Sequence, residues 1–145
     1  MQEIVGNFWD VRSEVKVITT NGDINRLGKA VMGRGIAKQA ADRYPELPTI
    51  LARFLRSHGN HIIYLGRLDD TNFLSFPVKD HWNEKAKLSL IARSIQELLE
   101  AAEFMGAQGF LLPRPGCGNG GLLWSEVKPI LEPRLDDRFT IINLT

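Results

Sequence analysis

The stretch LSLIARSIQELLEAAEFMGAQGFLLPRPGCGNGG, residues 88–121, decides the fold, because a helix pattern, a strand pattern and a glycine-rich loop follow one another in it. Apolar residues recur at the helical period from about Ala86 to Met105. Gly106 then fits the left-handed position at which many helices end. Consecutive apolar residues over 109–113 are typical of a strand buried on both faces. The stretch therefore predicts a long helix that leads into a central strand.

Helix and strand patterns alternate on both sides of this stretch. Strands are expected at residues 4–8, 15–18, 62–65, 73–78 and 139–144. Helices are expected at 36–44, over the apolar run that Gly59 closes, and at 125–135. Ser125 is expected to cap the last helix, and Pro129 to distort its start. Asp69–Asn72 reads as a hairpin connection. The alternation predicts an α/β fold with a largely parallel sheet and helices on both faces.

Composition and charge narrow the class of protein. The chain has 145 residues, of which 43% are hydrophobic and 24% charged, so we expect one globular domain over residues 1–145. Lys and Arg total 18 against 17 for Asp and Glu. This balance argues against a strongly basic nucleic-acid coat and leaves room for a local basic patch. No apolar run approaches the ~20 residues of a membrane span, and the first residues do not resemble a signal peptide.

The cysteine and histidine content bears on cofactors and compartment. Cys117 is the one cysteine, which excludes an internal disulfide and a cysteine-rich zinc site. A small residue in a tight glycine turn suits it better than a nucleophile, since no histidine or asparagine pairing is evident. His58, His61 and His81 lack the spacing of a metal set. We expect a cytoplasmic protein that uses no metal and no redox cofactor.

Two glycine-rich loops each stand directly before a helix, at 33–36 and 116–121. Ligands of parallel sheets bind beyond the carboxyl ends of the strands, and helix N-termini offer free N–H groups to anions. Two such loops are suited to clamp a diphosphate from opposite sides. Neither matches the G-x-G-x-x-G fingerprint or the Walker lysine pattern, which disfavours a dinucleotide dehydrogenase or a P-loop NTPase.

Three stretches carry a resemblance to a known family: MGRGIA at 32–37, FPVKDHW at 76–82 and GCGNGGL at 116–122. The chain resembles macrodomains, the ADP-ribose-binding fold. Within them it resembles the terminal ADP-ribose glycohydrolase branch, which includes bacterial DNA ADP-ribosyl glycohydrolase antitoxins. The third stretch is the most specific, and the lysine of the second distinguishes this branch. The resemblance covers nearly the whole chain and implies a three-layer α/β/α fold with a mixed, largely parallel central sheet.

The resemblance also implies roles for individual residues. Asn7 and the backbone of Phe8 would hold the adenine edge, and Asn21 would contact the distal ribose. Lys79 would be the catalytic residue at the anomeric carbon. The two loops would wrap the diphosphate; their residues are Gly33, Arg34, Gly35, Ile36, Gly116, Cys117, Gly118, Asn119, Gly120 and Gly121.

The residues themselves agree with this chemistry in outline. The anomeric carbon of a ribosylated group is an electrophile that a neutral lysine amine can attack, and a dry pocket or a neighbouring cation lowers a lysine pKa. A partner acid is less evident. Some relatives carry an aspartate near the second loop, whereas Leu123 stands here. His81 is a candidate because extended geometry would place it on the same face as Lys79. Asp23 is a candidate for orienting water.

Aromatic and cationic residues follow the predicted strand ends. Trp9 and Trp82 suit either stacking on a base or packing at the rim of a cleft, and Trp124 is expected to anchor the core. Arg34 and Arg114, together with Lys79, would make the mouth of the cleft positive.

The function that these observations favour is hydrolysis of an ADP-ribose linkage, which would release ADP-ribose from a modified DNA or protein. Three alternatives stay open: a module that binds ADP-ribose without turnover, a phosphatase of ADP-ribose 1″-phosphate, and an unrelated nucleotide-binding domain. The missing carboxylate leaves room for the first of these. The expected partner is ADP-ribose or an ADP-ribosylated macromolecule, DNA among them, with no membrane contact, and we expect a monomer.

Overall fold

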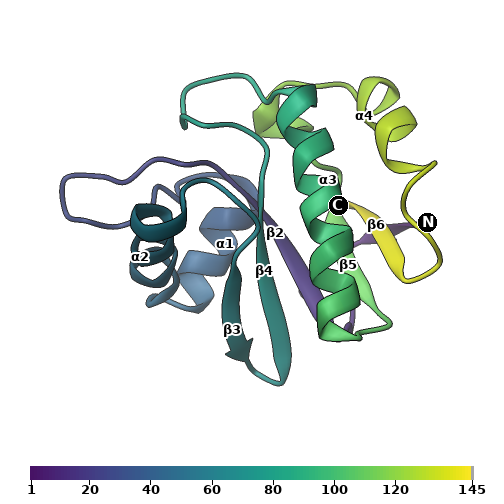
Figure 1. The fold of residues 1–145 in the computed structure, drawn as a ribbon, viewed down its shortest axis with the longest axis horizontal. Helices are drawn as coiled ribbons and strands as arrows, with labels where there is room; N and C mark the ends of the chain where they lie inside the picture. Colours follow the sequence, from purple (N-terminus) through teal and green to yellow (C-terminus); the bar gives the residue numbers. More distant parts are fainter. Residues whose placement is uncertain (145) are drawn as a thin grey trace.

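The computed structural model describes residues 1–144 and shows strands and helices in alternation (Figure 1). In chain order the elements are β1 (Gln2–Gly6), β2 (Val15–Thr20), α1 (Gly35–Arg43), α2 (Leu47–His58), β3 (Tyr64–Leu68), β4 (Thr71–Pro77), α3 (Leu88–Met105), β5 (Phe110–Pro113), the short 3-10 helix η1 (Gly118–Gly120), α4 (Trp124–Leu131) and β6 (Phe139–Leu144). The strands form one sheet in the order β1-β6-β5-β2-β4-β3. Every neighbouring pair is parallel except β3 and β4.

The sheet is buried on both faces, which gives the molecule three layers. Val17 and Leu74 pack in a cluster with apolar residues of α3 and α4. Their chain neighbours Ile18 and Phe73 pack in a second cluster with residues of α1 and α2. Successive strand residues point to opposite faces, so the four inner strands β6, β5, β2 and β4 each supply both cores. Figure 1 shows α3 crossing in front of the sheet. The predicted mixed sheet with helices on both faces is confirmed.

The hairpin between β3 and β4 is where the sheet becomes mixed. Asp69 and Asp70 have positive φ angles of 49° and 62°, the left-handed backbone that a two-residue hairpin turn requires. The predicted hairpin is therefore confirmed, but its connection is shorter than the predicted 69–72, because Thr71 and Asn72 already pair as part of β4. The strand before it begins at Tyr64, two residues later than expected, because the N–H of Ile63 is bound by the Ser75 hydroxyl oxygen at 3.0 Å.

Two other boundaries differ from expectation. β1 ends at Gly6 because the chain turns at Asn7, whose carbonyl accepts the N–H of Asp10 at 3.1 Å. The expectation that Ser125 caps the last helix is wrong. α4 already begins at Trp124, and the Glu126 carboxylate accepts the N–H of the residue before it, Leu123, at 3.1 Å. The helix ends at Leu131, four residues earlier than predicted.

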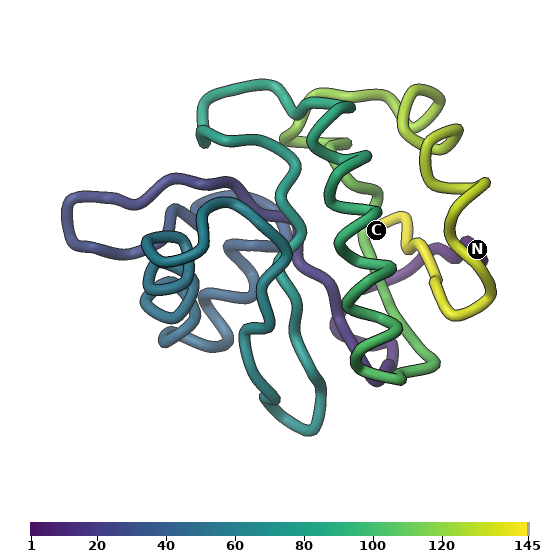
Figure 2. Tube along the Cα trace, viewed as in Figure 1, coloured from purple at the N-terminus to yellow at the C-terminus, as the bar shows by residue number. Residues whose placement is uncertain are grey.

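The connection from β2 to α1 is a long excursion over residues 21–34, which Figure 2 shows at the left. An isolated antiparallel bridge between Ile24 and Ala30 holds its two arms together. This excursion returns the chain to the carboxyl end of β2, where α1 begins. Within residues 1–144 no helix is both long and apolar enough to cross a membrane.

Candidate functional site

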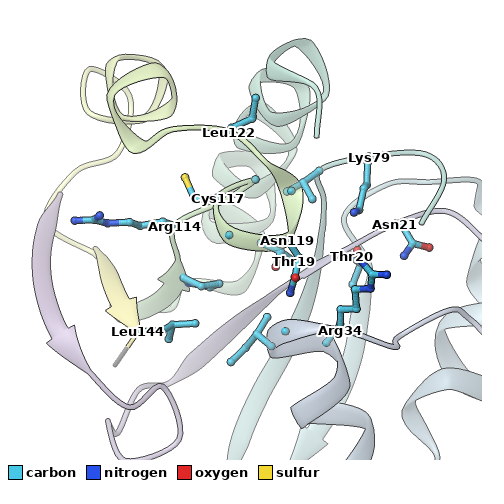
Figure 3. A pocket seen from close by; sticks show the side chains of 18 of the residues that line it. Thr19, Thr20, Asn21, Arg34, Lys79, Arg114, Cys117, Asn119, Leu122 and Leu144 are labelled. Atoms are coloured by element: carbon cyan, nitrogen blue, oxygen red, sulfur yellow. The ribbon is translucent and has the colours of Figure 1, made fainter. Parts of the chain in front are cut away.

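A cavity of about 680 Å³ lies beyond the carboxyl ends of β2, β5 and β6 (Figure 3). Its walls come from five segments that are distant in the sequence: residues 19–21, 31–37, 78–82, 113–124 and 142–144 each contribute. This is the edge at which a parallel sheet gathers its loops, so the position is the one that the fold favours for a ligand.

Most of the residues singled out from the sequence line this cavity. Lys79 and Asn21 do so, as do all four residues of the loop at 33–36. From the second glycine loop, Gly116 to Gly120 line it. Four separate segments that the sequence pointed to therefore line one cavity.

Asn7, Phe8 and Gly121 do not line the cavity. Asn7 is exposed, and its side-chain oxygen accepts the N–H of Trp9 at 2.9 Å. The Phe8 side chain is buried in the core on the α1 side. Gly121 faces away, toward the aliphatic stem of Lys85 at 3.4 Å from an added Cβ.

The two glycine loops approach each other across the cavity. Gly35 has a positive φ of 58°, and a Cβ added to it would lie 3.1 Å from the side-chain nitrogen of Asn119. Figure 3 shows Arg34 and Asn119 on neighbouring walls of the cavity. Gly35 opens α1, a helix of nine residues with no acidic side chain in its first turn. Free backbone N–H groups of that turn are therefore available to an anion between the loops.

The second loop is anchored at its ends and open in its middle. Leu122 donates its N–H to the Gly116 carbonyl at 2.9 Å, and Ala86 donates to the Gly120 carbonyl at 2.8 Å. Between these anchors, Gly118 has a φ of 68°, and nothing lies within 4 Å of an added Cβ. The loop therefore presents backbone without side chains to the cavity, and the hydrogen bonds at its two ends fix its position.

The charge of the cavity wall is entirely positive. Arg34, Lys79 and Arg114 line it, and no aspartate or glutamate is among the lining residues. The Arg114 side-chain Nε is buried and has no hydrogen-bond partner within the described residues. The Arg114 guanidinium stacks 4.8 Å from the centre of the Trp124 ring and lies 4.0 Å from the Glu3 carboxylate of β1, and these two contacts fix its direction. Such a wall is suited to a polyanion rather than to a metal ion.

Lys79 is a titratable group of this cavity whose pKa departs from its ordinary value. Burial lowers its pKa, and the nearby Arg34 cation lowers it further. Its amine donates one hydrogen bond, to the Glu84 carbonyl at 3.3 Å. Figure 3 shows the side chain pointing down into the cavity. The amine is thus held at the wall with a larger neutral fraction than an exposed lysine has.

The acids considered from the sequence are engaged outside the cavity. β4 ends at Pro77, so the extended geometry that would have put His81 beside Lys79 is absent. The Asp23 carboxylate instead binds the His81 ring nitrogen Nδ1 and the backbone N–H of Trp82, each at 2.8 Å. Neither His81 nor Asp23 lines the cavity. Asp23 therefore holds the segment that carries Lys79 and does not face the cavity.

Several lining residues escaped the sequence reasoning. Thr19 and Thr20 end β2, and Leu144 ends β6, and each contributes to the wall. A signal was available, since Thr19 and Thr20 directly follow a predicted strand and Leu144 ends one, but these residue types carry no distinctive chemistry. Trp124, expected as a core anchor, lines the cavity as well. Trp82 also lines it and is about half exposed beneath the Arg34 guanidinium.

Comparison with known proteins shows which proteins share this architecture. No protein-family model matches the chain. The "DNA ADP-ribosyl glycohydrolase" of Mycobacterium tuberculosis is 33% identical over 104 residues, which is 68% of this chain and 30% of that protein. The solved macrodomain of Mycobacterium tuberculosis DarG is 26% identical, covers the whole of both chains and superposes with a TM-score of 0.79. A Thermosipho africanus DarTG structure in complex with ADP-ribose is 23% identical over all of this chain and 42% of that one, with a TM-score of 0.77.

The layered sheet, its strand order and the cleft between two glycine loops therefore define a macrodomain, and this chain is one. Within that family it falls in the branch of the DarG macrodomains. The chain spans about a third of the length of the curated relatives that it matches.

Proposed function

We propose that this macrodomain binds ADP-ribose and hydrolyses its linkage to a macromolecule, and that DNA is the preferred target. The observation that carries the proposal is the position of one lysine amine on an acid-free cationic wall, close to two bare backbone loops. The relatives named for DNA ADP-ribosyl glycohydrolase activity support DNA over protein as the target.

The diphosphate would lie between the two glycine loops. The start of α1 supplies N–H donors from one side, and the backbone around Gly118 supplies a close approach from the other. Arg34 and Arg114 add positive charge to the same wall. A ligand with two phosphoryl groups uses all of these donors at once, which a singly charged ligand does not.

The orientation of the ligand follows from what lies at each end of the cavity. Gly6 pairs with Leu144, a lining residue, so Asn7 and the Phe8 backbone stand just beyond that wall. We place the adenine edge there. Lys79 and Asn21 lie together at the other end, in Figure 3 on the right, which suits the distal ribose. Asn21 is held for this role because its amide donates to the Val31 carbonyl at 3.1 Å.

The chemistry uses the lysine as a nucleophile. The neutral Lys79 nitrogen forms a bond to the anomeric carbon, and the bond from that carbon to the modified base breaks. The nitrogen loses a proton, which balances the proton that the departing base gains. The sugar ring of this adduct opens to an imine as the nitrogen proton passes to the ring oxygen. Water then adds to the same carbon, the carbon–nitrogen bond breaks, and the amine is restored with free ADP-ribose as product. This cycle requires no carboxylate, which agrees with a wall that has none.

A turnover panel tests the proposal. ADP-ribosylated DNA, an ADP-ribosylated glutamate peptide and ADP-ribose 1″-phosphate are each incubated with the wild type and with Lys79→Ala, and free ADP-ribose is quantified. We expect release from DNA by the wild type only. Calorimetry should find ADP-ribose affinity of Lys79→Ala within about tenfold of the wild type, or roughly 1.4 kcal/mol.

Each other outcome assigns a different function. Tight ADP-ribose binding with no release over hours would contradict the hydrolase and identify a binding module. Phosphate release from ADP-ribose 1″-phosphate that persists in Lys79→Ala would identify a phosphatase. An unchanged rate of release from DNA in Lys79→Ala would remove this lysine from the mechanism.

A further inference from the structure

A second cavity, of about 580 Å³, lies at the opposite end of α1 from the first. Arg34 stands before this helix and Arg43 ends it, so the two cavities are separated by roughly nine residues of helix, or about 13 Å along its axis. The second cavity is bounded by the loop after β1, the first residues of β2, the end of α1 and the β3–β4 hairpin. No role in the proposed reaction falls on any of its residues.

The cations of this second cavity lack partners. Arg12, Lys16 and Arg43 line it, and none of their side chains makes a hydrogen bond or an ion pair with any described residue. Lys16 is only 7% exposed as a residue, and it lines this cavity. Burial, and then the nearby Arg43 cation, lower the pKa of Lys16. The Asp10 carboxylate offsets part of this lowering of the pKa but forms no ion pair with the amine, so the amine has no direct counter-ion, which is costly for a largely buried lysine.

The acids that line the same cavity are occupied elsewhere. Asp69 accepts the hydroxyl of Tyr44 at 2.8 Å, Asp70 lies 3.9 Å from Arg67, and Glu14 accepts a backbone N–H at 3.2 Å. None of these carboxylates forms an ion pair with Arg12, Lys16 or Arg43, so the donors of the three cations stay free for an acceptor.

Aromatic rings fix the two inner cations. The Lys16 amine lies 5.4 Å from the centre of the Trp9 ring and 5.6 Å from that of Phe8, and Arg43 stacks 4.4 Å from Trp9. Trp9 is itself fixed, because its indole N–H donates to Gln39 at 2.8 Å. Contacts with ring faces orient a cation but leave its N–H donors unused. The donors are thus positioned in advance for an acceptor in the cavity.

We propose that this second cavity binds a phosphate monoester. Three unpaired cations match a group that carries a charge near −2 at neutral pH and presents three acceptor oxygens, better than they match a single carboxylate. The phosphate would bridge the Lys16 and Arg43 donors, with Arg12 at the rim. This site is independent of the ADP-ribose cleft, and neither assignment depends on the other.

Nuclear magnetic resonance of the ¹⁵N-labelled chain in phosphate-free buffer tests the site. Inorganic phosphate is titrated while the indole N–H signal of Trp9, assigned with Trp9→Phe, is followed. We expect a saturable shift, and we expect Lys16→Met to weaken binding at least about tenfold. Arg43→Gln, at an exposed helix end, should weaken it severalfold and covers the case in which Lys16→Met does not fold. Arg34→Gln is the matched control at the other end of α1 and should leave this titration unchanged.

Further arms identify the source of the phosphate. A nucleoside monophosphate, a sugar phosphate and acetate are titrated in the same way. If one ester binds more tightly than inorganic phosphate, that result identifies the chemical class of the ligand and supports the site. The proposal is overturned if the Trp9 signal does not saturate with phosphate, if Arg34→Gln weakens the titration as much as Arg43→Gln does, or if acetate binds as tightly as phosphate.

Discussion

The two glycine loops of the cleft look alike in sequence but use glycine for different physical reasons. In the loop at 33–36, an added Cβ on Gly33 meets nothing within 4 Å, so the space beside the backbone is empty. In the second loop, an added Cβ on Gly116 would lie 2.8 Å from Ile91 and 2.9 Å from Leu122. One loop keeps room for a ligand, whereas one end of the other is packed into the core. A glycine-rich motif therefore mixes binding positions with folding positions.

The way each loop is tied down differs as well. The second loop is held by apolar packing and by backbone hydrogen bonds to Ala86 and within itself. The excursion that carries the first loop is held through Asp23, whose carboxylate binds His81 and whose carbonyl accepts the Val31 N–H at 3.0 Å. Of the two, only the excursion that carries the loop at 33–36 contains a pair of groups that titrates, Asp23 and His81. The predictions below test this division, beginning with the largest effect.

Gly116→Ala should destabilise the whole protein. The new Cβ overpacks against Ile91 and Leu122, and the residue must hold a φ of 75°, so we expect a loss of about 2–4 kcal/mol in the free energy of unfolding. Urea unfolding followed by circular dichroism measures it. Gly109→Ala is the control, because its added Cβ meets only ordinary contacts at 3.8 Å or more. Equal midpoints for the two variants would show that Gly116 is not a packing position.

Gly118→Val should act on binding more than on folding. The side chain enters open space at the cavity, so steric conflict is with the ligand and not with the protein. We expect at least a tenfold loss of ADP-ribose affinity, about 1.4 kcal/mol, and a cost of roughly 1–2 kcal/mol in stability from the left-handed backbone. Calorimetry on the folded variant measures the affinity. Normal affinity would mean that this part of the loop does not approach the diphosphate.

Gly33→Ala should lower ADP-ribose affinity severalfold with a stability change below about 1 kcal/mol. Its backbone φ is not in the left-handed region, and no atom of the protein opposes the new methyl group. The paired measurements are calorimetry and thermal unfolding. If stability fell as far as in Gly116→Ala, the two loops would not differ in the way described above.

The smallest expected effect is a pH dependence of the stability that the Asp23–His81 pair gives to the excursion carrying the first loop. Hydrogen bonds from His81 and the Trp82 N–H outweigh the effect of burial and lower the pKa of Asp23. The hydrogen bond to Asp23 raises the pKa of His81. The contribution of Asp23 to the free energy of unfolding is present above the pKa of the unfolded state and is lost as pH falls through the lowered pKa of the folded state. The contribution of His81 is present below about pH 6.5 and is lost as pH rises through its raised pKa.

Thermal unfolding of the wild type and of His81→Gln between pH 5 and pH 9, about the range in which histidine titrates, measures this contribution. The advantage of the wild type should shrink toward the alkaline end. His58→Gln is the control, because that histidine lies on α2 away from the cleft. An advantage that does not change with pH would show that the ion pair does not stabilise the excursion.

Much of the fold was predictable because its signals are local and repeated. Each signal depends only on residues that are adjacent in the sequence. Examples are the helical period of α3, the consecutive apolar residues of β5 and the hairpin dipeptide Asp69–Asp70. The boundaries of α4 were not predictable, because Glu126 rather than Ser125 satisfies the N–H that begins the helix. Competition between two suitable side chains is decided by geometry that a sequence does not display.

The candidate site was predictable where a motif marks it and not elsewhere. Lys79 and both loops were located from their flanking residues. The engagement of Asp23 with His81 was not, since it joins residues 58 positions apart on the far side of a turn. The unpaired Lys16 was also not foreseen, because a lysine within a strand is ordinarily expected on a solvated surface.

Reductive trapping tests the central claim most directly. ADP-ribosylated DNA is turned over in the presence of sodium cyanoborohydride, which reduces an imine between an amine and the sugar carbon to a stable bond, and the adduct is mapped by mass spectrometry. The structure predicts one ADP-ribose adduct, on the peptide that contains Lys79, and none in Lys79→Ala. Release of ADP-ribose with no adduct, or with an adduct on another lysine that persists in Lys79→Ala, would contradict the account.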